Sequence, residues 1–271
     1  MIQQIWKKIR PIRLLNVDYK ILARIMSNRL KYVLPNIISP TQSCCIIGKY
    51  ISDTTIHVKD LMDVVEDDEL EAFLLKLDQE KAFDWVGQDY LFALLEKCGF
   101  DIKFCKWIRI FYNNVFCAVK CNGFLTRYFR LKNYVKQECP ISALLYVLVA
   151  EPLSAAIKQN KNILGLKIPN TDEEAKQFSH ADDTTLILSD KTSVNETFKV
   201  IALYSRASGA KLNRNKSEII SLGKGEITEE ELKNLNIKES KKVIQLFEIW
   251  IGRNNFELWT GRIKLIKYQC C

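Results

Sequence analysis

Apolar and polar residues alternate on both sides of a short acidic stretch near residue 180. Residues 173–178 lead into His180-Ala181-Asp182-Asp183, and residues 184–188 lead out of it with β-branched and leucine side chains. Two such runs around a short polar turn predict a β-hairpin with the acids at its tip. Carboxylates placed there can bind a hard divalent cation, but an Asp-Asp pair is also typical of a solvated turn.

A second acid ends another apolar run earlier in the chain. Residues 71–77 indicate a buried strand, Asp78 follows directly, and residues 79–85 indicate a turn into a helix. An acid at the end of a buried strand is a common position for a catalytic or ligand-binding group. The alternative is that Asp78 only caps the following helix, a role that aspartate fills well.

The rest of the pattern predicts helices with a few short strands. Apolar periodicity predicts helices over residues 18–34, 54–66, 90–98, 102–114, 142–160 and 195–209, and strands over residues 116–122 and 128–131. In the first helix we expect Ile21, Ile25 and Leu30 to form the apolar side. The longest apolar run, residues 141–150, is too short to span a membrane. The fold class is therefore α+β, with an antiparallel sheet and helices on one face.

Two strands that bring Asp78, Asp182 and Asp183 together would form a carboxylate cluster. Three like charges cannot all stay ionised at short range without a cation between them. Mg²⁺ held by carboxylates and substrate phosphates meets this need, and two such ions suit in-line phosphoryl transfer. Spacing alone leaves nucleotidyl transfer and nuclease chemistry both open.

The distribution of charge along the chain indicates a nucleic-acid partner. The chain of 271 residues has a formal net charge of +8, and residues 1–31 hold eight basic side chains against Asp18 alone. We expect this segment to form most of any phosphate-binding surface, with Lys20, Arg24 and Lys31 on the polar side of its helix. A helix side that is merely solvated is the alternative.

The cysteines and the N-terminus indicate in which cellular compartment the protein is located. Cys117 and Cys121 have no second pair at zinc spacing, and His57 and His180 are the chain's two histidines, so structural zinc is not expected. Cysteines kept as thiols, and an N-terminus without a signal-peptide pattern, predict an intracellular protein that is not secreted.

Six segments, in this order along the chain, carry a resemblance to a known family. They are residues 10–21, Gln42 with Gly48, Lys49 and Asp53, residues 77–84, residues 135–142, residues 181–183, and residues 208–213 with Lys216 and Ser217. Together they resemble the reverse transcriptase domain of non-LTR (LINE-type) retrotransposons, from about residue 10 to about residue 222. The resemblance implies a fingers fragment over residues 1–52, a palm with the catalytic motifs over residues 53–222, and a diverged remnant or truncated thumb over residues 223–271, so that the thumb is largely missing.

The resemblance also implies catalytic roles at matching positions. Asp78 and Asp182 would bind both metal ions, and Asp183 would complete the acidic site. Lys216 would donate a proton to the departing pyrophosphate, although a plain surface lysine is the alternative. The implied cofactor is two Mg²⁺ ions, for which Mn²⁺ could substitute.

Three further residues would contact the substrates. Arg10 would hold the triphosphate, and Gln137 would lie against the incoming nucleotide and its template base. Phe83 would pack under the sugar and reject a 2′-hydroxyl, unless it is an ordinary core aromatic. The implied partners are an RNA template, a DNA primer and deoxynucleoside triphosphates, with no membrane.

Departures from the family pattern predict weakened catalysis. Glu138 stands where the family has a glycine, and a glutamate there adds bulk and negative charge beside a triphosphate. His180 replaces an aromatic before Ala-Asp-Asp, and its imidazole could still pack there or could titrate near pH 6 to 7 and perturb the site. Cys44-Cys45 replaces a Gly-Phe pair, and Ala143 replaces a proline.

Three functions therefore remain open from the sequence. The first is an RNA-directed DNA polymerase domain that extends a primer by two-metal nucleotidyl transfer. The second is a catalytically dead retrotransposon remnant that only binds nucleic acid. The third is a metal-dependent nuclease, which would have no use for Gln137 or for a gate at Phe83.

Overall fold

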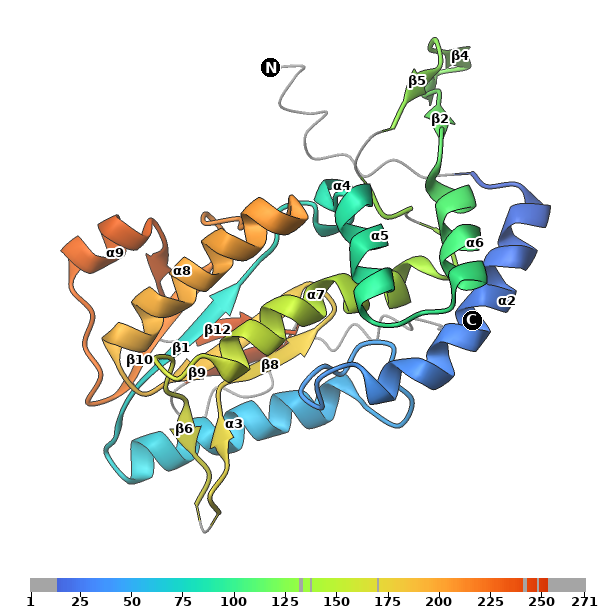
Figure 1. The fold of residues 1–271 in the computed structure, drawn as a ribbon. Helices are drawn as coiled ribbons and strands as arrows, with labels where there is room; N and C mark the ends of the chain where they lie inside the picture. Colours follow the sequence, from blue (N-terminus) through green and yellow to red (C-terminus); the bar gives the residue numbers. More distant parts are fainter. Residues whose placement is uncertain are drawn as a thin grey trace.

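A five-stranded sheet forms the centre of the molecule (Figure 1). The computed structural model describes residues 14–131, 134–136, 138–169, 171–240, 243–247 and 249–252. The strand order across the sheet is β11 (Lys238–Glu239), β10 (Glu218–Gly223), β1 (Glu71–Leu77), β9 (Asp183–Leu188) and β8 (Gln177–His180). Neighbouring strands are antiparallel, except that β11 runs parallel to β10. The α+β class with an antiparallel sheet is confirmed.

Strand β1 lies in the middle of this sheet and is buried on both faces. Its side chains alternate between two hydrophobic clusters, with Ala72 and Leu74 in one and Phe73, Leu75 and Leu77 in the other. Full burial of one such leucine or phenylalanine stabilises the fold by about 1.5–3 kcal/mol. The central strand therefore fixes the position of whatever follows Leu77.

Helices cover both faces of the sheet, which corrects the expectation of one helical face. The face of Phe73 is covered by α7 (Ser142–Gln159), α8 (Lys191–Ser208) and α9 (Glu229–Leu235). The face of Leu74 is covered by α3 (Ile51–Asp67) and the hairpin of β12 (Val243–Leu246) and β13 (Ile249–Gly252). The second face needs its own cover because it is as apolar as the first.

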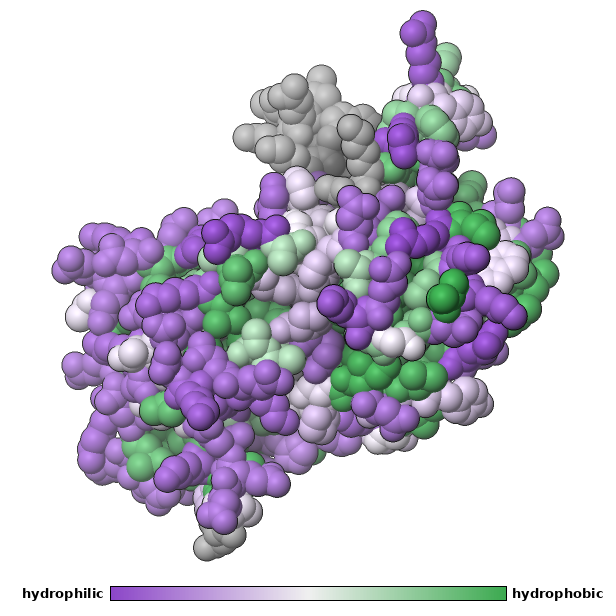
Figure 2. Space-filling model, viewed as in Figure 1, coloured by the Kyte–Doolittle hydropathy of each residue, from purple (hydrophilic) through white to green (hydrophobic). Residues whose placement is uncertain are grey.

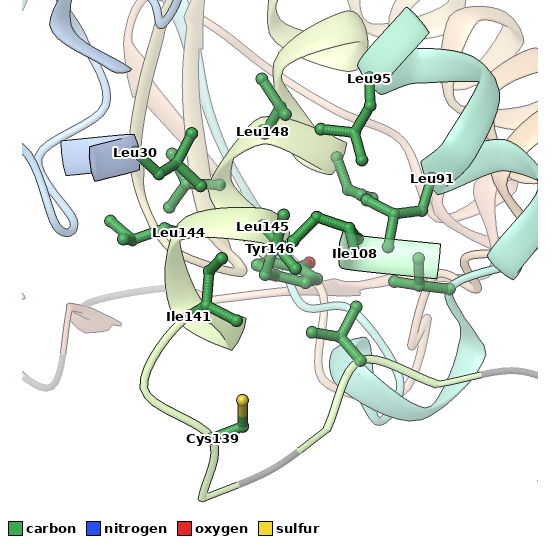
Figure 3. Packing of buried hydrophobic residues seen from close by; sticks show 14 of the residues in the cluster. Leu30, Leu91, Leu95, Ile108, Cys139, Ile141, Leu144, Leu145, Tyr146 and Leu148 are labelled. Carbon is green, nitrogen blue, oxygen red and sulfur yellow. The ribbon is translucent and has the colours of Figure 1, made fainter. Parts of the chain in front are cut away.

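A third cluster of buried side chains lies around the first half of α7 (Figure 3). Its other contributors include α2 (Val17–Val33), η1 (Leu34–Asn36), α4 (Ala82–Trp85), α5 (Gln88–Lys97) and α6 (Ile102–Tyr112). Leu91 of α5 and Ile108 of α6 lie beside Leu145 and Tyr146 of α7. This packing holds the start of α7 in place relative to the sheet.

Helix α2 is confirmed, but its expected apolar side is wrong at two of three positions. Ile21 and Ile25 are 55% and 52% exposed, whereas Leu30 is buried. The other buried positions are Ala23, Met26 and Ser27. A serine packs there because its hydroxyl donates to the carbonyl oxygen of Pro140, at 3.1 Å. Figure 2 shows hydrophobic residues reaching the surface over the half of the molecule that contains α2 and α6.

Three short ribbons extend from these layers. They pair β2 (Phe116–Cys117) with β5 (Phe129–Arg130), β3 (Lys120–Cys121) with β4 (Phe124–Leu125), and β6 (Leu166–Lys167) with β7 (Glu174–Ala175). The strand expected over residues 116–122 is therefore broken into two. Asn122 and Gly123 both have positive φ (47° and 85°), so the chain reverses there in the kind of tight turn that Asn-Gly favours.

The longest apolar run of the sequence lies in α7, which continues through Pro152 to Gln159. Across the described parts of the chain, no helix has the length and apolar character that a membrane span needs. Glu151 of this helix is half-buried, and burial raises the pKa of its carboxyl group. The backbone of Ser39 and the charges of Lys158 and Lys49 lower that pKa in part.

We expect Glu151→Gln to stabilise the protein at neutral pH. A raised pKa means that the folded protein binds the proton more tightly than the unfolded chain, so the stability contribution of Glu151 is lost as pH rises through the raised pKa. A glutamine does not ionise, so its stability contribution does not fall as pH rises, and it can still accept a hydrogen bond from the Ser39 backbone. The melting temperature should rise by about 1–3 °C at pH 8 and by little at pH 4. A gain of equal size at both pH values, or a matching gain for the exposed Glu230→Gln, would contradict this account.

Candidate active site

The sheet brings the three acids to one end of two neighbouring strands. Leu77 pairs with Thr184 in the antiparallel register of β1 and β9, so Asp78 and Asp183 continue the same register side by side. His180 pairs with Asp183 across β8 and β9, which leaves Ala181 and Asp182 as the two-residue turn. The predicted hairpin is confirmed, with Asp182 in the turn and Asp183 on the strand.

Tyr146 of α7 lies beneath these acids and is almost fully buried. Its hydroxyl donates to Gln79 Oε1 at 2.8 Å, and its ring stacks on Phe83 with 4.7 Å between centroids. Burial raises the pKa of Tyr146 well above its usual value, and electrostatic repulsion from the carboxylates of Asp182, Asp183 and Asp78 raises it further. The register of β1, β9 and β8 places the three acids at the same end of the sheet, and Tyr146 reaches that end through Gln79, the residue after Asp78.

The hairpin turn is held by a buried glutamine. Gln42 Oε1 accepts hydrogen bonds from the backbone N–H groups of Ala181, at 3.0 Å, and Cys44, at 2.9 Å. Ala181 has a φ of +54°, a conformation in which a side chain is strained and which a hairpin turn normally gives to glycine. Gln42 also forms an isolated bridge with Ser179 of β8. The segment around Gln42 thus fixes the turn that carries Asp182.

His180 lies at the base of the same turn, with Nδ1 at 3.0 Å from the Ser43 hydroxyl. Burial lowers the pKa of His180 from its usual value. Burial therefore favours the neutral form of this imidazole. The imidazole occupies the position where the family pattern has an aromatic residue.

On the other side of β1, the loop before β10 contacts Asp78 through its backbone. The Asp78 N–H donates to Ser217 Oγ at 3.2 Å, and the Asn213 N–H donates to the Asp78 carbonyl oxygen at 2.8 Å. Lys216 stands next to Ser217 with its side chain exposed. The structure therefore brings Lys216 to the strand end that carries Asp78, as the motif order suggested.

Similarity to known proteins identifies the family of this chain. A sequence model of the family described as "Reverse transcriptase (RNA-dependent DNA polymerase)" matches residues 3–245. The chain belongs to the reverse transcriptase family. The match continues about twenty residues beyond the expected limit near residue 222, through α9 and into β12.

Two curated relatives have the names of mobile elements. The "Transposon TX1 uncharacterized 149 kDa protein" of Xenopus laevis is 31% identical over 259 residues, which are 96% of this chain and 20% of that protein. The "Retrovirus-related Pol polyprotein from type-1 retrotransposable element R2" of Popillia japonica is 25% identical over 218 residues, which are 79% of this chain and 29% of that protein. The chain thus spans less than a third of these relatives. A diverged domain of the non-LTR, LINE type is confirmed.

Solved structures support the fold assignment. Telomerase from Candida albicans superimposes with a TM-score of 0.55 at 12% identity, covering 87% of this chain and 36% of that one. Apo telomerase from Candida tropicalis, truncated of its C-terminal domain, gives a TM-score of 0.56 at 12% identity, covering 87% of this chain and 43% of that one. These matches confirm a reverse transcriptase fold of fingers and palm.

The substrate motif of this reverse transcriptase domain is described in part. Arg10 and Gln137 lie outside the described residues, so their expected roles stay predictions. Glu138 has a φ of +62°, which explains why glycine is usual at this position. The Val135 N–H donates to the Phe83 carbonyl oxygen at 2.6 Å. The motif therefore lies beside the short helix α4, which carries Phe83.

Phe83 contacts the core, and its role against the sugar stays a prediction. It is half-buried, packs against the cluster around α7, and stacks on Tyr146 below the acids. A core contact on one side leaves part of the ring accessible on the other. The position is compatible with contact to a bound nucleotide.

Members of this family use divalent metal ions, and the acids here fit such an ion by their chemistry. Carboxylate oxygens are the donors that Mg²⁺ prefers, and Mg²⁺ usually takes one or two carboxylates together with water and substrate phosphates. Among the described residues, no three acidic, histidine or cysteine side chains already surround one point. Asp78, Asp182 and Asp183 are the residues that would hold the ion, with the substrate supplying further oxygens.

Two residues of the site were not assigned a role from the sequence. Gln42 belonged to a recognised motif, but its contact with Ala181 spans 139 positions and has no local signal. Tyr146 stands in the apolar run of α7, where the pattern indicates only burial. Both act through long-range contacts, which periodicity does not report.

We expect Tyr146→Phe to lower both the free energy of unfolding and the rate of primer extension. Loss of the phenol leaves Gln79 Oε1 without its donor and should cost about 1 kcal/mol of unfolding free energy. Tyr204→Phe is a matched control, because its buried hydroxyl donates to the Val149 carbonyl oxygen at 3.1 Å. Thermal unfolding should change alike in both variants, while primer extension should fall about three- to tenfold only for Tyr146→Phe. Equal activity in the two variants would show that the phenol does not position the site.

Proposed function

We propose that this domain is an RNA-directed DNA polymerase that extends a DNA primer on an RNA template. The observation that carries the proposal is the register of β1 and β9, which sets Asp78 beside Asp183 with Asp182 in the adjoining turn. The family assignment supports reverse transcription and a nucleic-acid template as partner. Deoxynucleoside triphosphates are the substrates that we propose.

The proposed mechanism is in-line nucleotidyl transfer. The primer 3′-hydroxyl oxygen bonds to the α-phosphorus of the nucleotide, the hydroxyl proton passes to solvent, and the bond to the pyrophosphate oxygen breaks. Asp78, Asp182 and Asp183 would hold two Mg²⁺ ions, which supply a lowered hydroxyl pKa and stabilise the leaving oxygen. Lys216 would give its proton to the departing pyrophosphate.

Three residues would position the nucleotide. Phe83 would contact the sugar from its half-buried place above Tyr146. Arg10 would hold the triphosphate, since a guanidinium suits phosphate oxygens, and Gln137 would lie against the base pair. Mn²⁺ could replace Mg²⁺ because both accept carboxylate and phosphate oxygens.

We also propose the domain boundaries that the motifs suggested. Residues 1–52 would be a fingers fragment and residues 53–222 the palm, which then contains β1, β8, β9 and all of β10 except Gly223. Residues 223–271 would be a diverged remnant or truncated thumb. In its described part, β11 pairs with β10 and Ile244 packs against the hydrophobic cluster on one face of the sheet.

A specific observation favours a second candidate, a remnant that binds nucleic acid without polymerising. Glu138 combines an unfavourable positive φ with a negative charge in the nucleotide-binding motif. A carboxylate near a triphosphate would repel it, while the basic N-terminal segment could still bind a template-primer duplex.

Primer extension by the purified chain tests these alternatives. A labelled DNA primer on an RNA template is incubated with Mg²⁺ or Mn²⁺, with and without deoxynucleoside triphosphates. Extended products support the polymerase. Salt-dependent binding of the duplex without extension supports the remnant, and cleavage of the labelled strand without nucleotides supports a nuclease.

A further inference from the structure

Two adjacent cysteines stand next to the glutamine that holds the hairpin turn. The Sγ atoms of Cys44 and Cys45 are 3.4 Å apart, and both side chains are half-buried thiols. Cys45 has a φ of +60°, so this dipeptide already departs from regular backbone. The segment is therefore a tight turn with two neighbouring thiols that solvent can reach.

We propose that Cys44 and Cys45 form a reversible oxidation site that is coupled to the acidic hairpin. A peroxide is the oxidant. One thiolate attacks a peroxide oxygen, and the O–O bond breaks to give a sulfenic acid and the first water. The second thiol then attacks that sulfur and forms the S–S bond with release of the second water. Two thiols lose two electrons in total, and hydrogen peroxide gains them.

Reversibility follows from the geometry of neighbouring residues. Cα atoms across a trans peptide are 3.8 Å apart, whereas disulfides usually join Cα atoms at least 4.4 Å apart. A disulfide between neighbours is therefore strained, and strained disulfides are the ones that are reduced most readily. Closing the gap between the Sγ atoms from 3.4 Å to a covalent bond also requires the Cys44–Cys45 backbone to move.

That movement would reach the candidate active site through one oxygen atom. Gln42 Oε1 accepts from the N–H groups of both Cys44 and Ala181, so a shift at Cys44 disturbs the contact that holds Ala181. Ala181 sits at +54° in φ directly before Asp182, and such a conformation persists only while its surroundings enforce it. Oxidation would therefore loosen the turn that carries Asp182.

Other thiols in the described part of the chain have different surroundings. Cys139 is buried with its Sγ 3.3 Å from the Tyr19 hydroxyl, and Cys105 is buried beside the carbonyl oxygen of Phe100. Cys270 and Cys271 form a second adjacent pair in the sequence and are replaced by serine in the test protein. Cys98, Cys117 and the exposed Cys121 keep their thiols in this protein, so an oxidation-dependent change at the hairpin is attributed to Cys44 and Cys45 only where Cys45→Gly abolishes it.

The test treats this protein with hydrogen peroxide and blocks the remaining thiols with N-ethylmaleimide. The tryptic peptide of residues 32–49 contains these two cysteines and no other. We expect it to lose the mass of two hydrogens and to take up no maleimide, and we expect dithiothreitol to reverse this. Recovery of the peptide with two maleimides, or with a sulfinic acid, would overturn the oxidation site.

Amide hydrogen exchange then tests whether oxidation loosens the hairpin. The effect of this loosening on catalysis rests on the proposed function. Exchange over residues 177–185 should become about tenfold faster on oxidation, as expected when a hydrogen bond is lost. Gln42→Ala should reproduce the faster exchange without peroxide, and Cys45→Gly, which tolerates positive φ, should abolish the response to peroxide. Unchanged exchange despite the disulfide would overturn the coupling. Neither readout needs polymerisation, so a failure of primer extension leaves this test intact.

Discussion

Asp78→Asn should reduce primer extension by about a thousandfold or more. The substitution keeps the size of the side chain but removes the charge that would hold a divalent ion beside Asp182 and Asp183, and charge stabilisation of the transition state is usually the largest catalytic contribution. The rate is measured by single-nucleotide addition to a labelled primer, with Mg²⁺ in excess.

The fold should not suffer from this change, because one of three neighbouring like charges disappears. We expect the melting temperature of Asp78→Asn to equal that of the wild type or to exceed it. Asp172→Asn, in the exposed turn between β6 and β7, is the matched control and should keep full activity. Retained extension by Asp78→Asn, or an equal loss in the control, would refute the assignment of the site.

Glu138→Gly should raise both stability and nucleotide incorporation. The residue has a φ of +62°, and left-handed backbone costs a side-chain-bearing residue about 1–2 kcal/mol. Glycine removes that cost but gains freedom in the unfolded chain, so we expect a net increase of about 1 kcal/mol in the free energy of unfolding. Removal of the carboxylate should also lower the KM for the nucleotide by about tenfold, since like charges no longer repel.

Glu138→Gln separates the two effects. It removes the charge but keeps the strained backbone, so its unfolding free energy should match the wild type while its KM falls. Denaturant unfolding measures the first quantity and steady-state incorporation the second. If Glu138→Gly stabilises the protein but leaves incorporation undetectable, the remnant that only binds nucleic acid becomes the better account of this domain.

The elements of the palm could be predicted because their signals are local. Strand β1 and the acidic hairpin follow from apolar runs that end at Asp78 and at Asp182, and α7 follows from an uninterrupted apolar stretch. These patterns arise from burial of each segment's own side chains. The placement of the acids at neighbouring strand ends also followed, since antiparallel pairing can bring two strand ends together.

The packing of α2 shows where local signals end. The periodicity of Ile21 and Ile25 indicated an apolar side, yet the helix buries Ala23 and Ser27, and Ser27 contacts Pro140 just before α7. Which side of an amphipathic helix is buried depends on the shape of the neighbouring elements and on how closely the helix can pack against them. The same reasoning applies to the second sheet face, where α3 and the β12–β13 hairpin supply a cover that the pattern did not indicate.

The sequence by itself determined the family, the strand ends that carry the acids, and the positions that depart from the family pattern. Those properties reside in residue type and order, which a single chain displays directly. Only the tertiary structure decided that Gln42 holds Ala181, that Tyr146 donates to Gln79 and stacks on Phe83, and that Glu138 occupies left-handed backbone. The first two are contacts between distant segments and the third is a backbone angle imposed by them, so each exists only once the layers have packed.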